Sequence, residues 1–273
     1  SRASTLIRMT EQRKSVLAIA SIWVWCIPLL PLGLAIAIYI GELQTPTFLF
    51  INRYTQILPD TVWTWLTFIG NGWGIFALCF PLLLLAPRLL CAGILASTIG
   101  GTLSQIIKPF LAFPRPAGVL ALEDFYRIGE PLLHRAMPSG HTLTAFAVVS
   151  GIYFASDRDK RTSLWWIFII AGFAGISRNA LGAHWLTDVL AGCAIGLWSG
   201  MLGAGLARLI PEAQLATNKI LPRLLALGGL ATIYVLLTQT LDSELNQSLQ
   251  YACVALISIT LALFIKAQKP RAI

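Results

Sequence analysis

The chain is dominated by apolar stretches long enough to cross a lipid bilayer. They lie near residues 16–40, 62–86, 89–107, 142–156, 163–182, 187–209, 220–238 and 249–266. A helix needs about 20 apolar residues to span a hydrocarbon core roughly 30 Å thick. We therefore predict an all-α, polytopic transmembrane helix bundle with about eight spans. Six is the alternative, because the fourth stretch is short and the last two could form a hairpin that does not cross fully.

The polar segments between these stretches are too short for a separate soluble domain. Only 12% of the 273 residues are charged, about half the share found in soluble domains. We predict a single integral-membrane domain over 1–273, with a catalytic signature region over 108–188. The third to sixth spans then form the catalytic core, and 211–273 forms an additional C-terminal helix pair.

The basic residues indicate which side of the membrane each loop faces. With the N-terminus inside and eight spans, 14 of the 20 Lys and Arg residues fall on the cytoplasmic side, as the positive-inside rule requires. The net charge of +8 is therefore mainly a topology signal and not evidence for nucleic-acid binding. We predict that both termini are cytoplasmic. The outer side receives Arg53, Lys108, Arg115, Arg127, Arg135 and Arg178.

Two further patterns concern packing. The outer connection over 117–136 mixes apolar and charged residues, as an interfacial helix, a lid or a plain surface loop would. In the sixth span, Gly192, Gly196 and Gly200 recur every four residues and so share one face of a helix. We interpret these glycines as a surface for close helix packing.

Three polar segments stand out on the outer side. They are "KPFLAFPRP" at 108–116, "PSGH" at 138–141 and "SRNALGAHWLTD" at 177–188. Taken alone, Lys108 or Arg178 is explained equally well as a functional residue or as a structural one whose side chain extends from a helix end to the lipid headgroups. The combination of several cations with histidines and a carboxylate instead indicates a chemical site.

These residue types match the requirements of phosphoryl transfer. The reaction needs positive charge and fixed donors around the phosphate oxygens, a nucleophile in line with the leaving oxygen, and an acid that protonates it. Lys108, Arg115 and Arg178 supply cationic donors. Ser139 supplies a hydroxyl group. Gly140 lets backbone N–H groups approach an anion at a helix start, where the helix dipole also favours negative charge.

The two histidines of the motifs have different neighbours. His184 and Asp188 lie one helical turn apart, so the carboxylate can fix the imidazole tautomer and stabilise the charge that the ring acquires on attack. We therefore predict that His184 is the nucleophile and forms a phosphohistidine. His141 is then the general acid for the leaving group and later the base for water. His134 lies outside every motif and is interpreted as an ordinary loop residue.

The three segments resemble the signature of the type 2 phosphatidic acid phosphatases, a family that shares its site with vanadium haloperoxidases and bacterial acid phosphatases. Eleven residues agree with that signature in order and spacing. The resemblance covers roughly the third to sixth spans. It implies the roles just given, and it implies a reaction that needs no metal or cofactor. The sequence shows no carboxylate or Cys/His cluster that could hold a metal ion, which fits this expectation. The last two spans depart from it and leave oligomerisation or a second activity open.

We therefore expect a metal-independent lipid phosphatase of a bacterial inner membrane, with its site facing the periplasm or cell exterior. It would hydrolyse a phosphomonoester or diphosphate on a lipid of the outer leaflet. The candidate substrates are undecaprenyl diphosphate, phosphatidylglycerophosphate, phosphatidate and lipid A, and the sequence does not choose among them.

The same residues leave three alternatives to a lipid phosphatase open. A lipid phosphotransferase would pass the phosphoryl group from the same phosphohistidine to an acceptor hydroxyl. A lipid transporter would bind headgroups without turnover and would need no His–Asp pair. A haloperoxidase would hold vanadate in the same pocket, although eight apolar spans do not fit that soluble chemistry.

Overall fold

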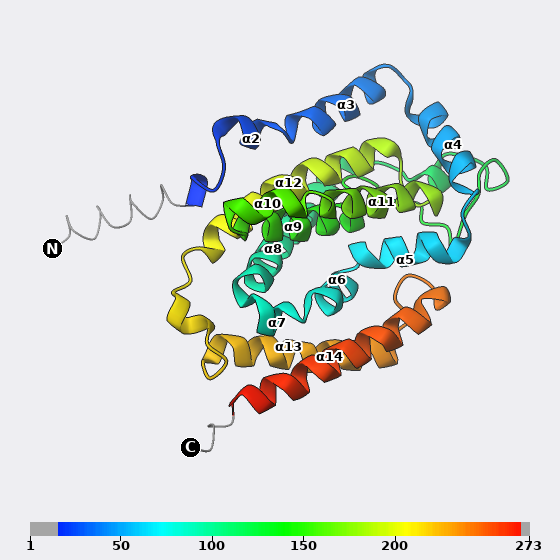
Figure 1. Cartoon of the computed structure of the whole chain (residues 1–273). Coiled ribbons are helices and arrows are strands. Elements are labelled where there is room, and N and C mark those ends of the chain that lie inside the picture. The colour runs from blue at the N-terminus through cyan, green and yellow to red at the C-terminus, as the bar shows by residue number, and fades with distance from the viewer. Residues whose placement is uncertain (1–15, 269–273) are drawn as a thin grey trace, which may run out of the picture.

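The computed structural model describes residues 16–268, which consist of helices and loops without a strand (Figure 1). The predicted all-α fold is confirmed. In chain order the helices are α2 (Ile22–Cys26), α3 (Leu29–Ile40), α4 (Gln44–Thr55), α5 (Asp60–Gly70), α6 (Gly72–Cys79), α7 (Leu82–Leu85), α8 (Pro87–Leu111), α9 (Gly140–Ala155), α10 (Arg158–Leu164), α11 (Ile167–Ala180), α12 (Leu186–Ala207), α13 (Ile220–Thr238) and α14 (Gln247–Gln268). Short 3-10 helices lie at η1 (Pro116–Gly118), η2 (Glu212–Leu215) and η3 (Glu244–Asn246).

By length and composition, five helical segments within the described residues are able to cross a membrane, and the α5–α6 pair makes a sixth if it is counted as one bent span. α9 has 16 residues and α11 has 14, which is shorter than the roughly 17 to 25 residues that a helix needs to cross the hydrocarbon core. These two helices correspond to the fourth and fifth predicted stretches. The count of eight spans therefore stays a prediction.

The contact between α9 and α12 explains the spacing of the glycines in α12. A Cβ atom at Gly192 would lie 2.7 Å from the carbonyl oxygen of Ser139, and one at Gly196 would lie 2.6 Å from a backbone oxygen of α9. A Cβ atom at Gly200 would collide with the side chain of Ser150. The interpretation of these glycines as a packing surface is confirmed, and the close approach brings the starts of α9 and α12 together.

The second apolar stretch is broken rather than straight. α5 and α6 meet at Asn71 with a bend of 82°. The side-chain oxygen of Asn71 accepts hydrogen bonds from the amides of Trp73 and Gly74, so this residue caps the start of α6. A Cβ atom at Gly70 would lie 2.6 Å from the carbonyl oxygen of His141. Glycine is therefore needed where the bend touches the start of α9.

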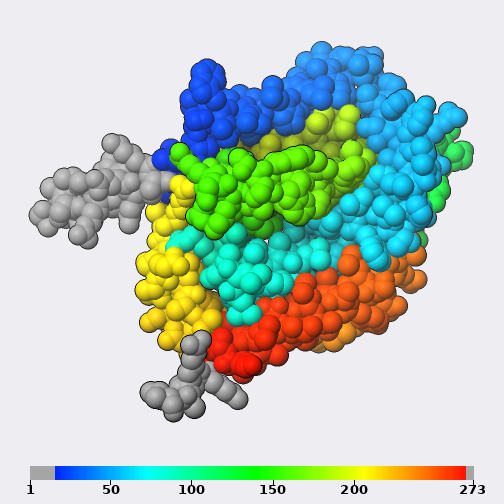
Figure 2. Space-filling model, in the orientation of Figure 1, coloured from blue at the N-terminus to red at the C-terminus, as the bar shows by residue number. Residues whose placement is uncertain are grey.

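The C-terminal helices α13 and α14 form a hairpin along one side of the bundle, drawn from orange to red in Figures 1 and 2. Phe80, Leu236 and Ile257 belong to one buried apolar cluster that joins the hairpin to α5–α8. A Cβ atom at Gly229 in α13 would collide with the ring of Phe80. The hairpin is therefore packed directly against the part of the fold that contains the bend at Asn71.

The long connection between α8 and α9 is an irregular loop apart from η1. The loop nevertheless has a buried anchor. The ring of Phe125 packs edge-on against Phe48, with 5.4 Å between ring centroids, and Phe48 packs in the same way against Trp185. Of the alternatives drawn from the sequence, the structure therefore supports a loop rather than an interfacial helix.

The membrane orientation can be tested by cysteine labelling. The two ends of the described chain lie on the side of the bundle opposite the 112–139 loop (Figure 1), while the termini themselves are outside the described residues. The distribution of basic residues predicts that this loop faces outward. After replacement of the five native cysteines, Glu123→Cys is expected to react with a membrane-impermeant maleimide in intact cells. Ser163→Cys, in exposed α10, should react only after lysis, and the reverse pattern would contradict the orientation.

Candidate active site

Four helix ends bring the three polar motifs together. The last turns of α8 and α11 carry Lys108 and Arg178, and the first turns of α9 and α12 carry His141 and Asp188. The connecting loops add the remaining predicted residues. Direct contacts and close charge interactions link the complete predicted set, which consists of Lys108, Arg115, Ser139, Gly140, His141, Arg178, His184 and Asp188.

His184 is buried, with 1% of its surface exposed, and both ring nitrogens have partners. Nδ1 lies 3.2 Å from Oδ2 of Asp188, and Nε2 lies 3.0 Å from Nη1 of Arg115. A guanidinium group can only donate, so Nε2 is the acceptor and the ring proton resides on Nδ1, which donates to the carboxylate. The lone pair of Nε2 therefore points toward Arg115. This is the tautomer that a nucleophilic histidine requires.

Asp188 and Trp185 fix the position of the His184 ring. The backbone N–H of Trp185 donates to Oδ2 of Asp188 at 2.9 Å, and the indole Nε1 of Trp185 donates to the carbonyl oxygen of Pro114 at 2.8 Å. Asn179, at the end of α11, donates from Nδ2 to the carbonyl oxygen of His184 at 2.8 Å. The ring and backbone of His184 are thus held by separate hydrogen bonds from both neighbouring helices.

Arg115 lies over His184 because the loop backbone holds its guanidinium group. Nε donates to the carbonyl oxygen of His134 at 2.8 Å, and Nη1 also donates to that of Ala183 at 3.1 Å. The side chain of His134 makes none of these contacts, and the residue contributes through its backbone. The guanidinium group of Arg115 is therefore held beside Nε2 of His184, where its N–H groups are placed to donate to an anion.

Arg178 is buried and incompletely paired. It is 5% exposed, and Nη1 donates to the hydroxyl oxygen of Thr67 at 3.4 Å. Its Nε has no hydrogen-bond partner among the described residues. A buried polar group without a partner is costly, so this guanidinium group is available to a ligand anion. Thr67 was not singled out from the sequence, because it lies on α5, far from the motifs.

The start of α9 combines a helix cap with a nearby cation. The hydroxyl oxygen of Ser139 accepts hydrogen bonds from the backbone N–H of Thr142 at 3.4 Å and from its hydroxyl at 2.9 Å. The backbone N–H of Ser139 donates to the carbonyl oxygen of Asp188 at 3.0 Å, which ties α9 to α12. A Cβ atom at Gly140 would lie 3.9 Å from Nζ of Lys108. Gly140 thus leaves room beside the ammonium group.

His141 has a partner that sequence reasoning missed. Its Nε2 lies 2.8 Å from Oδ1 of Asp242, in the loop between α13 and α14. Oδ2 of the same carboxylate accepts a hydrogen bond from Nδ2 of Asn71 at 3.1 Å. A separation of 101 residues hides this pair from any local motif. The C-terminal hairpin, which departs from the family signature, therefore reaches the candidate site.

The electrostatic surroundings keep His184 neutral. Burial lowers the pKa of His184 well below its ordinary value, and the positive charges of Arg115, Arg178 and Lys108 lower it further. Among residues 16–268 there is no group of three or more His, Cys, Asp or Glu side chains that could hold a metal ion. The independence from metals stays a prediction, and the arrangement itself is that of an anion site.

Two adjoining cavities lie beside these residues. A polar one of about 230 Å³ is lined by Lys108, Gly140 and His141 together with the bend between α5 and α6. A larger one of about 510 Å³ lies between α6, α8, α9 and α13, within the 300–1,000 Å³ typical of ligand sites. Gly72 and Thr144 line both cavities.

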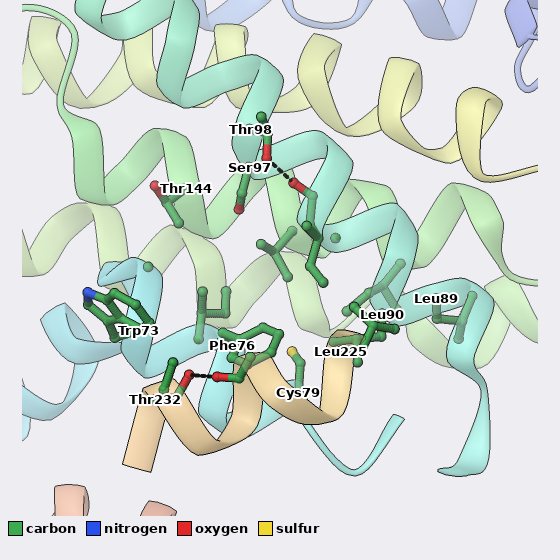
Figure 3. Close-up of a pocket in the computed structure, with 18 of the residues that line it drawn as sticks. Trp73, Phe76, Cys79, Leu89, Leu90, Ser97, Thr98, Thr144, Leu225 and Thr232 are labelled. Atoms are coloured by element: carbon green, nitrogen blue, oxygen red, sulfur yellow. Dashed lines mark hydrogen bonds between the residues drawn. The ribbon is translucent and has the colours of Figure 1, made fainter. Parts of the chain in front are cut away.

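The larger cavity is mainly apolar, as Figure 3 shows. Leu90, Phe76 and Leu225 are among the labelled side chains that line it. The hydroxyls of Thr98 and Thr232 donate to carbonyl oxygens of their own helices at 2.8 and 2.7 Å. These two threonines therefore satisfy their polar atoms within their own helices.

Residues 86–208 match the family described as the PAP2 superfamily. The chain contains a PAP2 superfamily domain. The match includes α8, α9, α11 and α12, and it contains all three polar motifs. The family resemblance expected from the sequence is confirmed, whereas the roles of the individual residues stay predictions. α13, α14 and Asp242 lie outside the matched range.

Three known proteins are similar to this chain over part of its length. It is 29% identical to glucose-6-phosphatase 3 of Mus musculus over 204 residues, which are 67% of this chain and 58% of that protein. It is 40% identical to lipid A 1-phosphatase of Porphyromonas gingivalis over 75 residues, 27% of this chain and 16% of that protein. The crystal structure of LpxE from Aquifex aeolicus matches with a TM-score of 0.52 and 29% identity, covering 59% of this chain and 94% of that one.

The environment of His184 predicts an unusual titration. Because burial and three cations disfavour the charged ring, protonation requires a lower pH than for a free imidazole, which titrates near pH 6.5. We expect ¹⁵N NMR of labelled histidine to find His184 neutral, with its proton on Nδ1, at pH 6.5. Lys108→Met removes one repelling charge and should raise the pKa of His184. Lys219→Met, at an exposed site before α13, should not, and a wild-type His184 that is charged at pH 6.5 would refute the assignment.

Proposed function

We propose that this chain is an integral-membrane lipid phosphatase that removes a phosphomonoester or diphosphate group through a phosphohistidine intermediate. The observation that carries the proposal is the position of Lys108. Its charge acts on the buried His184–Asp188 pair together with those of Arg115 and Arg178. Its side chain also lines, with His141, a pocket that adjoins an apolar cavity. A site of this kind has a place for a phosphate group and a place for a hydrocarbon tail.

In the first step the phosphate enters between the cationic side chains, and Arg115 donates to it. Nε2 of His184 is then free to attack phosphorus, forming the N–P bond as the bond to the leaving oxygen breaks. Asp188 accepts the hydrogen bond from Nδ1 and stabilises the positive imidazole. Lys108 and Arg178 balance the charge on the equatorial oxygens. His141 gives its proton to the leaving oxygen.

In the second step water replaces the departed alcohol or phosphate. His141, now neutral, takes a proton from the water while the water oxygen attacks phosphorus. The N–P bond breaks, inorganic phosphate leaves, and His184 returns to the neutral form with its proton on Nδ1. Ser139 and Gly140, at the start of α9, add a hydroxyl and backbone donors for the phosphate oxygens.

A lipid substrate is favoured over a soluble sugar phosphate by the apolar cavity. The likeness to glucose-6-phosphatase 3 is a specific reason to consider the soluble substrate, and the likeness to lipid A 1-phosphatase supports a lipid. Glucose 6-phosphate carries no tail that would fill an apolar space of about 510 Å³. Trp73 and Leu224, two exposed residues, line this space, so a tail can enter it from the surrounding bilayer.

The location of the reaction follows from the charge distribution. We propose a bacterial inner membrane, cytoplasmic termini and a site that faces the periplasm or cell exterior. The substrate is then a phosphorylated lipid of the outer leaflet, such as undecaprenyl diphosphate, phosphatidylglycerophosphate, phosphatidate or lipid A. We further propose that the reaction needs no metal, because three cations around the phosphate already supply the charge that a divalent ion would otherwise bring.

The activity can be tested directly with purified protein and a panel of these lipids, with glucose 6-phosphate as the soluble comparison. We expect phosphate release from at least one lipid, unchanged by EDTA and inhibited competitively by orthovanadate. His184→Ala should lower the rate by several orders of magnitude, as loss of a nucleophile does. Glu244→Gln, in the exposed η3 helix, is a control that should retain activity.

Different failures of this experiment have different meanings. No release from any substrate would refute the phosphatase proposal and favour a lipid transporter. Loss of activity in EDTA that magnesium restores would refute metal independence. Dephosphorylated lipid without an equal amount of free phosphate would identify a phosphotransferase.

The role of the apolar cavity can be tested by filling it. Gly228 lines the cavity, and a Cβ atom there would make only an ordinary contact with Phe76 at 3.5 Å. We expect Gly228→Phe to raise KM for a long-chain lipid phosphate at least several-fold while KM for a soluble aryl phosphate stays unchanged. Leu230→Phe, on the exposed face of the same helix, is the matched control. Equal effects of Gly228→Phe on both substrates would rule out a tail site.

A further inference from the structure

The loop between α13 and α14 delivers a carboxylate to the candidate catalytic acid. Oδ1 of Asp242 lies 2.8 Å from Nε2 of His141, and 15% of the Asp242 side chain is exposed. His141 belongs to the matched PAP2 segment, whereas Asp242 comes 34 residues after that segment ends at residue 208. The pair therefore joins the common core to a part of the chain that the family match does not include.

Buried polar side chains hold this loop in one conformation. Gln250 is 3% exposed; its Oε1 accepts from the backbone N–H of Leu241, and its Nε2 donates to the carbonyl oxygens of Leu236 and Gln239 at 2.8 Å. Asn246 is fully buried and donates to the carbonyl oxygen of Leu241 at 3.0 Å. Buried polar groups of this kind are expensive in a membrane hairpin, and Oδ1 of Asn246 has no hydrogen-bond partner among the described residues. Here they fix the residue that precedes Asp242.

The Asp242 backbone and side chain are both constrained. The residue has φ of +64°, a left-handed conformation that Asp, Asn and Gly adopt more readily than other residues. Its second carboxylate oxygen accepts from Asn71, the residue that also caps α6. Trp65 of α5 donates to the carbonyl oxygen of Leu245 at 3.3 Å and ties the loop to the bundle. The carboxylate is thus preorganised against His141 from two sides.

The surroundings favour the ionised form of this carboxyl group. Burial is the largest single influence and would raise the pKa of Asp242. The hydrogen bond and charge of His141, the charge of Arg178 and the hydrogen bond from Asn71 together lower it below its ordinary value. An ionised carboxylate can only accept, which places a proton on Nε2 of His141. Nδ1 is then the nitrogen that exchanges protons with other groups.

We propose that Asp242 is a positioning residue for His141, and that the C-terminal hairpin is therefore part of the catalytic unit. The inference rests on the proposed phosphatase reaction. The hydrogen bond and negative charge of Asp242 favour the doubly protonated, cationic form of the His141 ring that acts as the acid. Asp242 keeps the Nε2 proton and orients the ring so that Nδ1–H faces the leaving oxygen. The proton passes from Nδ1 to that oxygen as the P–O bond breaks, and Nδ1 later removes a proton from the attacking water. Asp242 touches neither substrate nor phosphate in either step.

The test compares two substrates that differ in their need for an acid. The alcohol that leaves phosphatidate needs a proton on its oxygen, whereas 4-nitrophenyl phosphate releases 4-nitrophenolate, which is stable as an anion. Rapid-quench measurement of phosphoenzyme formation is made with wild type, Asp242→Gly, His141→Ala and the double variant. Glycine suits the left-handed backbone at this position. Asp242→Asn, which also tolerates it and keeps an acceptor oxygen, is the conservative variant.

We expect Asp242→Gly to slow phosphoenzyme formation from phosphatidate at least about tenfold, which is less than the roughly 10²- to 10⁴-fold that complete loss of a general acid costs, because His141 itself remains. The rate with the aryl phosphate should change far less, and Asp242→Asn should recover part of the loss. In the His141→Ala background, removal of Asp242 should have no further effect. Equal losses on both substrates, or losses that add to those of His141→Ala, would assign Asp242 a merely structural role and overturn the proposal. Faster turnover in Asp242→Gly would also overturn the proposal, because it would show that Asp242 blocks the site and inhibits the reaction.

A second measurement separates this inference from the phosphatase reaction. If wild-type protein forms no phosphoenzyme from any substrate, the proposed function fails, but ¹⁵N NMR still reports the His141 tautomer. We expect the neutral ring to carry its proton on Nε2 in the wild type and to mix both tautomers in Asp242→Gly. An unchanged tautomer would overturn the positioning role. Glu244→Gln, two residues away on an exposed side chain, serves as the control in both measurements.

Discussion

The organisation of this protein depends on positive charge concentrated at the ends of membrane helices. Arg178 is almost fully buried and keeps an unpartnered nitrogen among the described residues, while Arg115 and Lys108 act on the same histidine. Like charges so close together repel one another, and burial strengthens the repulsion. A phosphate group carries the opposite charge, so this arrangement favours anion binding. Burial and the same positive charges lower the pKa of His184 and so disfavour its protonated form.

That arrangement requires helices that approach very closely. The glycines of α12 leave space for the backbone of α9, and Gly70 leaves space for the backbone of His141. In a bilayer, where lipid tails are as apolar as the helices, such contacts and interhelical hydrogen bonds are the main source of association. The hydrogen bond from the Ser139 amide to the Asp188 carbonyl links the start of α9, which carries His141, to the start of α12, which carries Asp188.

The sequence was sufficient for the features that are local or periodic. Apolar length indicated the helices, and fixed spacing within three segments indicated Lys108, Arg115, Arg178 and the two histidines before their contacts were seen. It was insufficient where the determining contact is distant. Asp242 and Thr67 meet the site across more than a hundred residues, and neither stands in a recognisable pattern. The bend at Asn71 was missed because the apolar content continues through it. The two polar residues Asn246 and Gln250, next to and within the last apolar stretch, were the available signal that the hairpin is more than an anchor.

The sharp bend between α5 and α6 brings two kinds of recognition into one short segment. Gly70 touches the backbone of His141, Asn71 bonds to Asp242, and Gly72 borders both the polar pocket and the apolar cavity. Three consecutive residues thus connect the apolar cavity with the surroundings of His141. A displacement of α6 would reach His141 through Asn71 and Asp242. The bend therefore joins the wall of the apolar cavity to the neighbourhood of the histidine within a single turn of chain.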